Sequence, residues 1–181
     1  MKVLTAPMMV VLTALALALL SHDARALPSV GASRPQLRLV DAWERVLDLS
    51  NVGSRPLLVI YEDKDSATQN AALKQELSEL SKGDRYKTRV VLAAVADVAA
   101  YDYWPVRGFV KDAIRGESQK AHTPIYCDWD GGARRALEAK AGMSNVILYG
   151  RDGRVLFAHV GAMSEATRSN LLELLRGEVE S

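Results

Sequence analysis

Few residues of this chain have the types and spacing that chemistry requires. Cys127 is the only cysteine among 181 residues, so no internal disulfide can form and any thiol reaction would use this side chain alone. It precedes Asp128, and a neighbouring carboxylate raises the pKa of a thiol and weakens it as a nucleophile. We therefore expect a buried structural cysteine; a peroxidatic or mixed-disulfide role is the alternative.

The segment Ser66–Gln69 has the pattern of a helix start. In a capping box the Ser66 hydroxyl accepts a hydrogen bond from the backbone of residue 69, and the Gln69 side chain reaches back. We prefer this structural interpretation to polar-ligand binding at free N–H groups of a helix terminus. Asp63 and Asp65 flank the segment, would repel an anion, and would favour the helix dipole.

Two further patterns contain carboxylates or histidines. In Asp128–Gly132 the spacing begins like a calcium-binding loop, but position 12 is Ala139, so the bidentate ligand is missing. Only about 50 residues follow, too few for a phosphatase built on Asp-x-Asp. His122 and His159 lack partners at metal-ligand spacing. The sequence therefore predicts a turn at Asp128, no metal and no cofactor.

An aromatic loop offers the best surface candidate. Tyr101, Tyr103 and Trp104 precede Pro105, and Arg107 follows. Aromatic residues and arginine are over-represented at recognition sites, and functional residues concentrate on loops at the carboxyl ends of strands. The alternative is that these rings cover the core.

Apolar runs predict the elements that position these residues. Pro56–Tyr61 is an unbroken apolar run, typical of a strand buried on both faces. A helix from Ser66 and a second strand at Thr88–Ala96 complete a right-handed βαβ unit. We also expect a short amphipathic helix at Val40–Leu47 and a helix from Gly108 that buries Phe109, Val110 and Ile114. A strand at Thr123–Cys127, a helix at Ala133–Ala141 and a hairpin of Val146–Tyr149 with Val155–Ala158 should follow. The final helix should begin at Ser164, turn Leu171, Leu172 and Leu175 inward and end before Gly177.

Charge and the N-terminal residues indicate the compartment. The 23 basic and 22 acidic side chains nearly cancel, which gives nucleic acid no field to bind. Lys2, the apolar stretch Val3–Leu20 and Ala24–Ala26 predict a signal peptide over residues 1–26, cleaved between Ala26 and Leu27. An uncleaved membrane anchor is the alternative. We expect an irregular segment over residues 27–39 and one domain over residues 40–178.

Several short motifs together resemble a known group. They are Asp65–Ala67, Gly83–Thr88, Phe109–Val110, Trp129–Arg134 and Asp152–Val155, and in order and spacing they are similar to the YtfJ family of exported proteins. The resemblance implies a periplasmic protein with a thioredoxin-like fold. That fold is a three-layer α/β/α sandwich with a mixed central sheet, a C-terminal antiparallel hairpin and, here, a redoxin-type α–β insertion.

The chain departs from the thioredoxin pattern at the positions of the redox cysteines and of the cis-proline. Counting from Leu57, the place of the Cys-x-x-Cys pair is taken by Ser66 and Gln69. The place of the cis-proline falls near Met143–Val146, which contains no proline. A serine hydroxyl lacks a thiolate's low pKa and cannot exchange disulfides.

These observations predict an exported thioredoxin-like binding or accessory protein without dithiol activity. Its partner would be a periplasmic protein or a small ligand, with no nucleic acid and no membrane contact beyond the uncleaved signal peptide. The expected binding edge joins the 62–69 loop, the 97–107 loop and Met143–Asn145, with Ser144 at its centre. A redoxin-type enzyme that uses Cys127 as a single thiol is the alternative.

Overall fold

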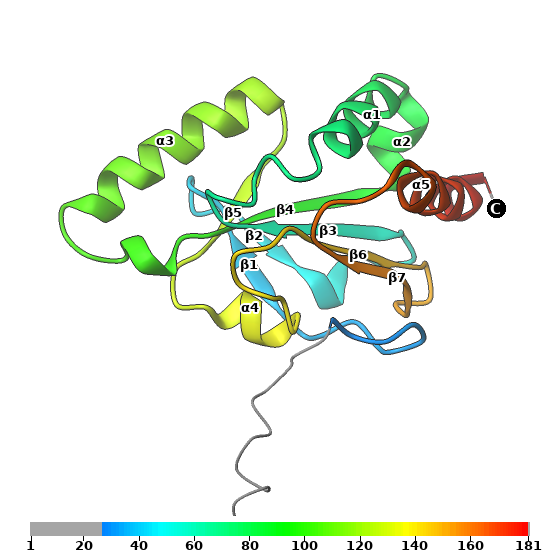
Figure 1. Ribbon diagram of the computed structural model, residues 1–181, viewed down its shortest axis with the longest axis horizontal. Helices are drawn as coiled ribbons and strands as arrows, with labels where there is room; N and C mark the ends of the chain where they lie inside the picture. Colours follow the sequence, from blue (N-terminus) through cyan, green and yellow to red (C-terminus); the bar gives the residue numbers. More distant parts are fainter. Residues whose placement is uncertain (1–26, 181) are drawn as a thin grey trace, which may run out of the picture.

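A five-stranded mixed sheet forms the centre of the computed structural model, which describes residues 27–180 (Figure 1). The strand order is β5-β4-β3-β6-β7; β3, β4 and β5 are parallel, and β6 and β7 are antiparallel to their neighbours. The strands are β3 (Leu57–Glu62), β4 (Val91–Asp97), β5 (Ile125–Asp128), β6 (Asn145–Tyr149) and β7 (Val155–Val160).

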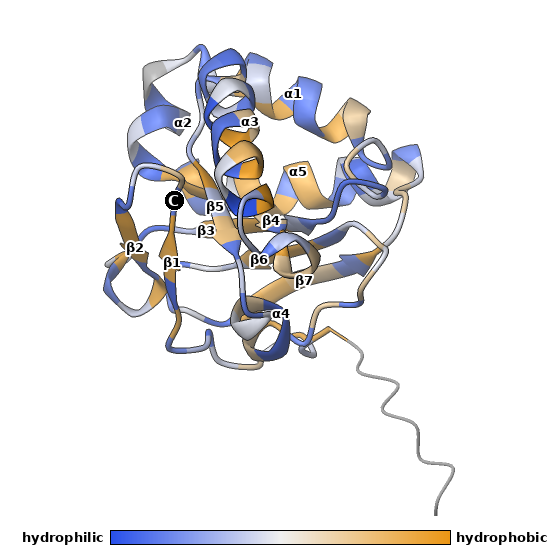
Figure 2. Ribbon diagram, turned by 90° about the vertical axis from the view of Figure 1, so that its left-hand side faces the viewer, coloured by the Kyte–Doolittle hydropathy of each residue, from blue (hydrophilic) through white to orange (hydrophobic). Residues whose placement is uncertain are grey.

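Strand β3 occupies the middle of the sheet because its residues are apolar on both faces. Leu57, Val59 and Tyr61 lie in one buried cluster, while Leu58 and Ile60 lie in the cluster on the other face. The predictions of this strand, of the βαβ unit and of the β6–β7 hairpin are confirmed. In Figure 2 the apolar strands lie inside and hydrophilic residues mark the helices around them.

Helices cover the sheet on both faces (Figure 1). One face packs against leucines of α1 and α5, and α3 covers its β5 side through Ile114. The opposite face packs against the short α4 and the N-terminal hairpin. The helices are α1 (Ala71–Ser81), α2 (Asp84–Arg89), α3 (Val106–Ala121), α4 (Gly132–Ala136) and α5 (Glu165–Glu180), with short 3-10 turns η1 (Leu49–Asn51) and η2 (Ala99–Tyr101).

The helix expected at Val40–Leu47 is wrong, because this segment forms the antiparallel strands β1 (Arg38–Val40) and β2 (Val46–Asp48). The buried Asp41 carboxylate accepts hydrogen bonds from the backbone N–H groups of Trp43 and Arg45 at 2.8 and 2.9 Å. Those bonds fix a tight turn, and Glu44 within it has a φ of 64°, which no right-handed helix contains.

Several helix details also differ from the expectation: α4 ends at Ala136 rather than at Ala141, and α2 extends to Arg89, so that the strand expected from Thr88 begins at Val91. Phe109 was expected in the core but is 71% exposed. Val110, Ile114 and Ser118 recur every four residues and turn that face of α3 to the sheet, which leaves Phe109 outside. Helix α5 does not end before Gly177; it continues to Glu180 because Val179 is buried and its carbonyl accepts a hydrogen bond from Arg89.

The turn at Asp41 predicts a pH-dependent stability. Burial raises the pKa of Asp41, but the hydrogen bonds from Arg45 and Trp43 outweigh burial and hold that pKa below its usual value. We expect Asp41→Asn to lower the free energy of unfolding at pH 7 by about 1–3 kcal/mol. The wild type should lose this extra stability as the pH falls below about 4, the ordinary pKa of an aspartate in the unfolded chain, and then through the lower pKa of Asp41 in the folded protein.

Urea denaturation at pH 7 and pH 3 measures both effects. Asp112→Asn is the matched control, since Asp112 pairs with Arg115 on the surface and its loss should change stability by less than about 0.5 kcal/mol. Equal effects of the two substitutions at pH 7 would contradict this account of the turn.

Candidate functional site

The carboxyl ends of the three parallel strands meet at one edge of the sheet and carry acidic residues. Glu62 ends β3, Asp97 ends β4 and Asp128 ends β5, with Asp97 and Asp128 directly opposite each other in register. Open α/β folds place their sites at this edge, so its side chains decide what the protein can do.

Ser66 is part of a closed turn at this edge. Its side chain is fully buried, and its hydroxyl donates to Asp63 Oδ1 at 2.7 Å and accepts from the Asp63 N–H at 3.0 Å. Helix α1 begins only at Ala71. The capping-box prediction is therefore wrong, because the Ser66 hydroxyl bonds backwards along the chain and the helix starts five residues later.

Gln69 bonds to a distant loop. Its Oε1 accepts a hydrogen bond from the backbone N–H of Ser144 at 3.0 Å, and Asp63 Oδ2 accepts one from Gly142 N–H at 2.9 Å. The Ser144 hydroxyl donates to Glu62 Oε1 at 2.7 Å. The structure thus brings together the predicted residues Asp63, Ser66, Gln69 and Ser144, but as partners of one another.

Asn70 is the central residue that sequence reasoning missed. Its side-chain amide donates to Ser144 Oγ and to the Gly161 carbonyl, both at 2.9 Å, and its Oδ1 accepts from Met163 N–H at 2.9 Å. The side chain is buried, and all three bonds cross to residues more than 70 positions away. An asparagine just before a helix points to an N-cap, but this one makes no cap hydrogen bond.

Lys74 completes this group, which we call the edge network: Glu62, Asp63, Ser66, Gln69, Asn70, Lys74 and Ser144. Its ammonium donates to Glu62 Oε2 and to the Ala67 carbonyl. Because nearly every buried polar atom of the network has a partner inside the protein, little of it is free to hold a ligand.

Asp128 lies at the same edge and is held by the protein. Its carboxylate accepts from Tyr61 Oη at 2.9 Å and from the N–H groups of Ala133 and Arg134 at 3.2 and 2.8 Å. Burial, followed by the charge of Asp128, raises the pKa of Tyr61, so the phenol stays a neutral donor. Within residues 27–180, no three His, Cys, Asp or Glu side chains gather as a metal ion requires.

Cys127 does not belong to the edge network. It lies on β5, at the border of the sheet, and packs in a cluster with Ala42, Val98 and Ile114. Burial raises its pKa to about 11, and the charge of Asp41 adds to the shift. The pKa of the thiol is raised, as the sequence predicted, but the cause is not Asp128. The Asp128 side chain turns to the opposite face of the sheet and bonds to Tyr61.

The aromatic loop divides into covering and exposed parts. Tyr101 is half-buried against the Cys127 cluster, and Arg107 lies 4.6 Å from the ring centroid of Trp129 and pairs with Asp102. Tyr103 and Trp104 are 57% and 91% exposed, and Phe109 is exposed as well. We call Tyr103, Trp104 and Phe109 the aromatic surface. Asp65 is exposed and only its backbone N–H is bonded, to Asp63.

Comparison with known proteins identifies the architecture. No protein-family model and no curated protein sequence matches the chain. A solved Chlorobium tepidum protein assigned as the thiol:disulfide interchange protein DsbE superimposes with a TM-score of 0.63 at 20% identity, over 85% of this chain and 99% of that one. The chain has the thioredoxin fold.

Two other solved structures share the thioredoxin fold with this chain. The pneumococcal exposed lipoprotein thioredoxin from Streptococcus pneumoniae matches with a TM-score of 0.59 and 15% identity, over 78% of this chain and 98% of that one. The bacterioferritin comigratory protein from Xanthomonas campestris matches with a TM-score of 0.59 and 15% identity, over 85% and 99%. Among residues 27–180, no helix has the length and apolar character to cross a membrane.

Asn70 provides a direct test of the edge network. We expect Asn70→Ala to lower the free energy of unfolding by about 2–4 kcal/mol, because the buried Gly161 carbonyl and the partly buried Met163 N–H lose their partners. Chemical denaturation measures this change. Gln75→Ala on the exposed face of α1 is the control and should cost less than about 0.5 kcal/mol. An Asn70→Ala variant as stable as the control would show that the network holds nothing together.

Proposed function

We propose that this protein is an exported binding or accessory module that uses the thioredoxin fold without thiol chemistry. The observation that carries the proposal is the state of its only thiol: Cys127 is buried under α3, and its pKa is raised to about 11. Because the thiolate is the reactive form, such a thiol is nearly unreactive at neutral pH.

The place expected for a redox pair supports the same proposal. Ser66 and Gln69 are engaged with Asp63 and Ser144, and neither side chain can exchange a disulfide. An edge network that satisfies its own polar atoms gives structure to the two loops it joins. Recognition would then fall to exposed groups around that edge.

The aromatic surface is the binding surface that we propose. Large aromatic side chains are costly to expose and are enriched at interfaces. The charged groups beside it are paired, Arg107 with Asp102 and Lys111 with Glu44. A protein partner with an apolar contact face fits this surface better than a nucleic acid.

Export and family are part of the proposal. The signal peptide, its cleavage between Ala26 and Leu27, and a periplasmic location rest on residues 1–26, which lie outside the described residues. The order of short motifs supports a place among YtfJ-like exported proteins. The pneumococcal relative in fold is described as an exposed lipoprotein, which is consistent with use of this fold outside the cytosol.

The rival is a redoxin-type enzyme with Cys127 as its single thiol. Proteins of the same fold are described as a thiol:disulfide interchange protein, a protein disulfide isomerase and a thiol-disulfide oxidoreductase, but at 12–20% identity the likeness shows the architecture alone. Burial and the raised pKa of Cys127 weigh against this role.

An insulin-reduction assay separates the two functions. With dithiothreitol as reductant, we expect the mature protein and Cys127→Ser to leave the rate at the uncatalysed level, because neither offers a reactive thiolate. A dithiol thioredoxin serves as the positive control in the same assay. Catalysis by the wild type that disappears in Cys127→Ser would overturn the proposal and establish the rival.

A further inference from the structure

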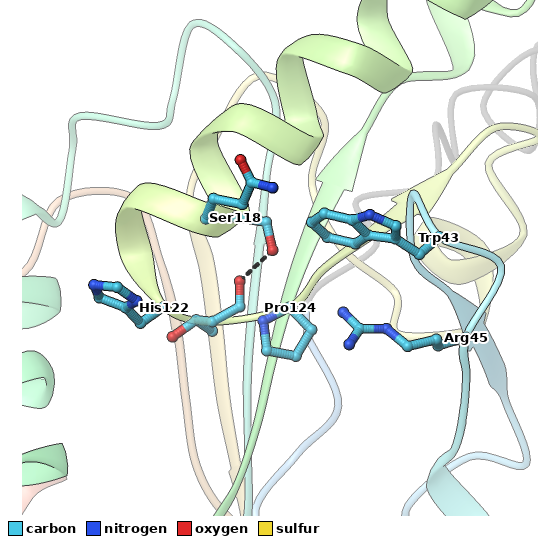
Figure 3. Close-up of a pocket in the computed structure, with 7 residues that line it drawn as sticks. Trp43, Arg45, Ser118, His122 and Pro124 are labelled. Atoms are coloured by element: carbon cyan, nitrogen blue, oxygen red, sulfur yellow. Dashed lines mark hydrogen bonds between the residues drawn. The ribbon is translucent and has the colours of Figure 1, made fainter.

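An open groove lies between the C-terminal end of α3 and the turn that joins β1 to β2 (Figure 3). It has a volume of about 630 Å³, within the usual range for small-molecule sites. The residues that line it are Trp43, Arg45, Ser118, Gln119, His122, Thr123 and Pro124. Pro124 directly precedes β5, so the groove lies at the amino end of that strand, away from the carboxyl edge.

Arg45 has a fixed position with unused donors. Its Nε donates to Asp41 Oδ2 at 2.6 Å, and Asp41 is itself held by two backbone N–H groups of the same turn. The guanidinium also lies 5.0 Å from the ring centroid of Trp43. In Figure 3 its terminal nitrogens point toward Pro124. The Arg45 side chain is 64% exposed, so its fork is accessible, and these two contacts orient it before a ligand arrives, which lowers the entropy cost of binding.

The lining residues are polar and apolar with one cation, Arg45, and no acidic side chain; the carboxylate nearest to Arg45 is Asp41, which is buried behind it and pairs with Nε alone. Trp43, which is 37% exposed, and Pro124 provide flat apolar surface beside the Arg45 fork. Figure 3 places His122 at the opposite end from Trp43 and Arg45, with Ser118 between them. The Ser118 hydroxyl donates to the Thr123 carbonyl at 2.6 Å and fixes the floor.

We propose that this groove binds a small organic anion with a planar carboxylate and a flat apolar body. The two terminal nitrogens of Arg45 match a carboxylate in a bidentate pair, the geometry that makes guanidinium selective for such groups. The apolar body packs between the Trp43 ring and Pro124, where both surfaces lose contact with water. This site is independent of the thiol-free function proposed above and of the aromatic surface.

Phenylacetate is a probe with both required parts. The test is an NMR titration of the mature protein that follows the indole N–H signal of Trp43, assigned with Trp43→Phe. We expect a saturating shift with a Kd of about 1–10 mM, the range that a ligand of this size reaches in an open groove. 2-Phenylethanol, which has the ring without the charge, should bind at least about 10-fold more weakly because it forms no charge-assisted pair.

Substitutions at Arg45, with one control elsewhere, test whether its guanidinium binds the carboxylate of phenylacetate. Arg45→Gln should weaken phenylacetate binding by about 10-fold or more. The affinity of Arg45→Lys should lie between those of the wild type and Arg45→Gln, because lysine keeps the charge but lacks the two-pronged guanidinium. Arg151→Gln, at an exposed arginine in the β6–β7 turn, should bind like the wild type. The backbone amide spectrum of each variant reports whether the fold is kept.

Three outcomes would overturn the proposal. One is the absence of any Trp43 shift up to about 50 mM phenylacetate, well above the expected Kd. Another is equal binding of 2-phenylethanol, and the third is unchanged binding by a folded Arg45→Lys variant. A shift confined to the indole signal of Trp104 would place binding on the aromatic surface and equally refute this site.

Discussion

The hydrogen bonds of Asn70 hold together three segments that are distant in sequence. The side chain lies at the start of α1 and joins the loop before β6 to the turn that follows β7, through Ser144, Gly161 and Met163. Buried amides are costly to leave unpaired, so the loops must keep this arrangement once the sheet has formed. The edge network of Ser66, Gln69 and their neighbours depends on these loop positions.

This constraint determines what the carboxyl edge can do. In the thioredoxin fold the helix start after β3 is the expected place for chemistry, yet here Ser66 and Gln69 serve as partners of Asp63 and Ser144. The one thiol lies two strands away, on β5, where burial keeps its proton bound. Surfaces outside the network, the aromatic surface and the groove of Trp43 and Arg45, remain open for recognition.

The parts of the fold that local sequence determines were predictable. An unbroken apolar run identified β3, and the Asp152-Gly153 turn identified the β6–β7 hairpin. The β1–β2 hairpin was not predictable, because the apolar residues Val40 and Leu47 fit a helical period equally well. The interaction that decides the structure is the hydrogen bond of the Asp41 carboxylate to the backbone of its own turn. At the candidate site Asp63, Ser66, Gln69 and Ser144 were foreseen, but Asn70 and the partners of these residues were not, since Ser144 lies 75 positions beyond Gln69 and pairing over such distances leaves no local signal.

The reactivity of Cys127 tests the central claim most directly. The rate of alkylation by iodoacetamide would be followed by mass spectrometry from pH 6 to pH 10, in the native protein and in urea. With the pKa raised to about 11, the native rate should rise across the whole range without a plateau and stay below the rate in urea at every pH. A native rate that levels off below pH 8 and equals the rate in urea would show an accessible thiolate and contradict a thiol-independent function.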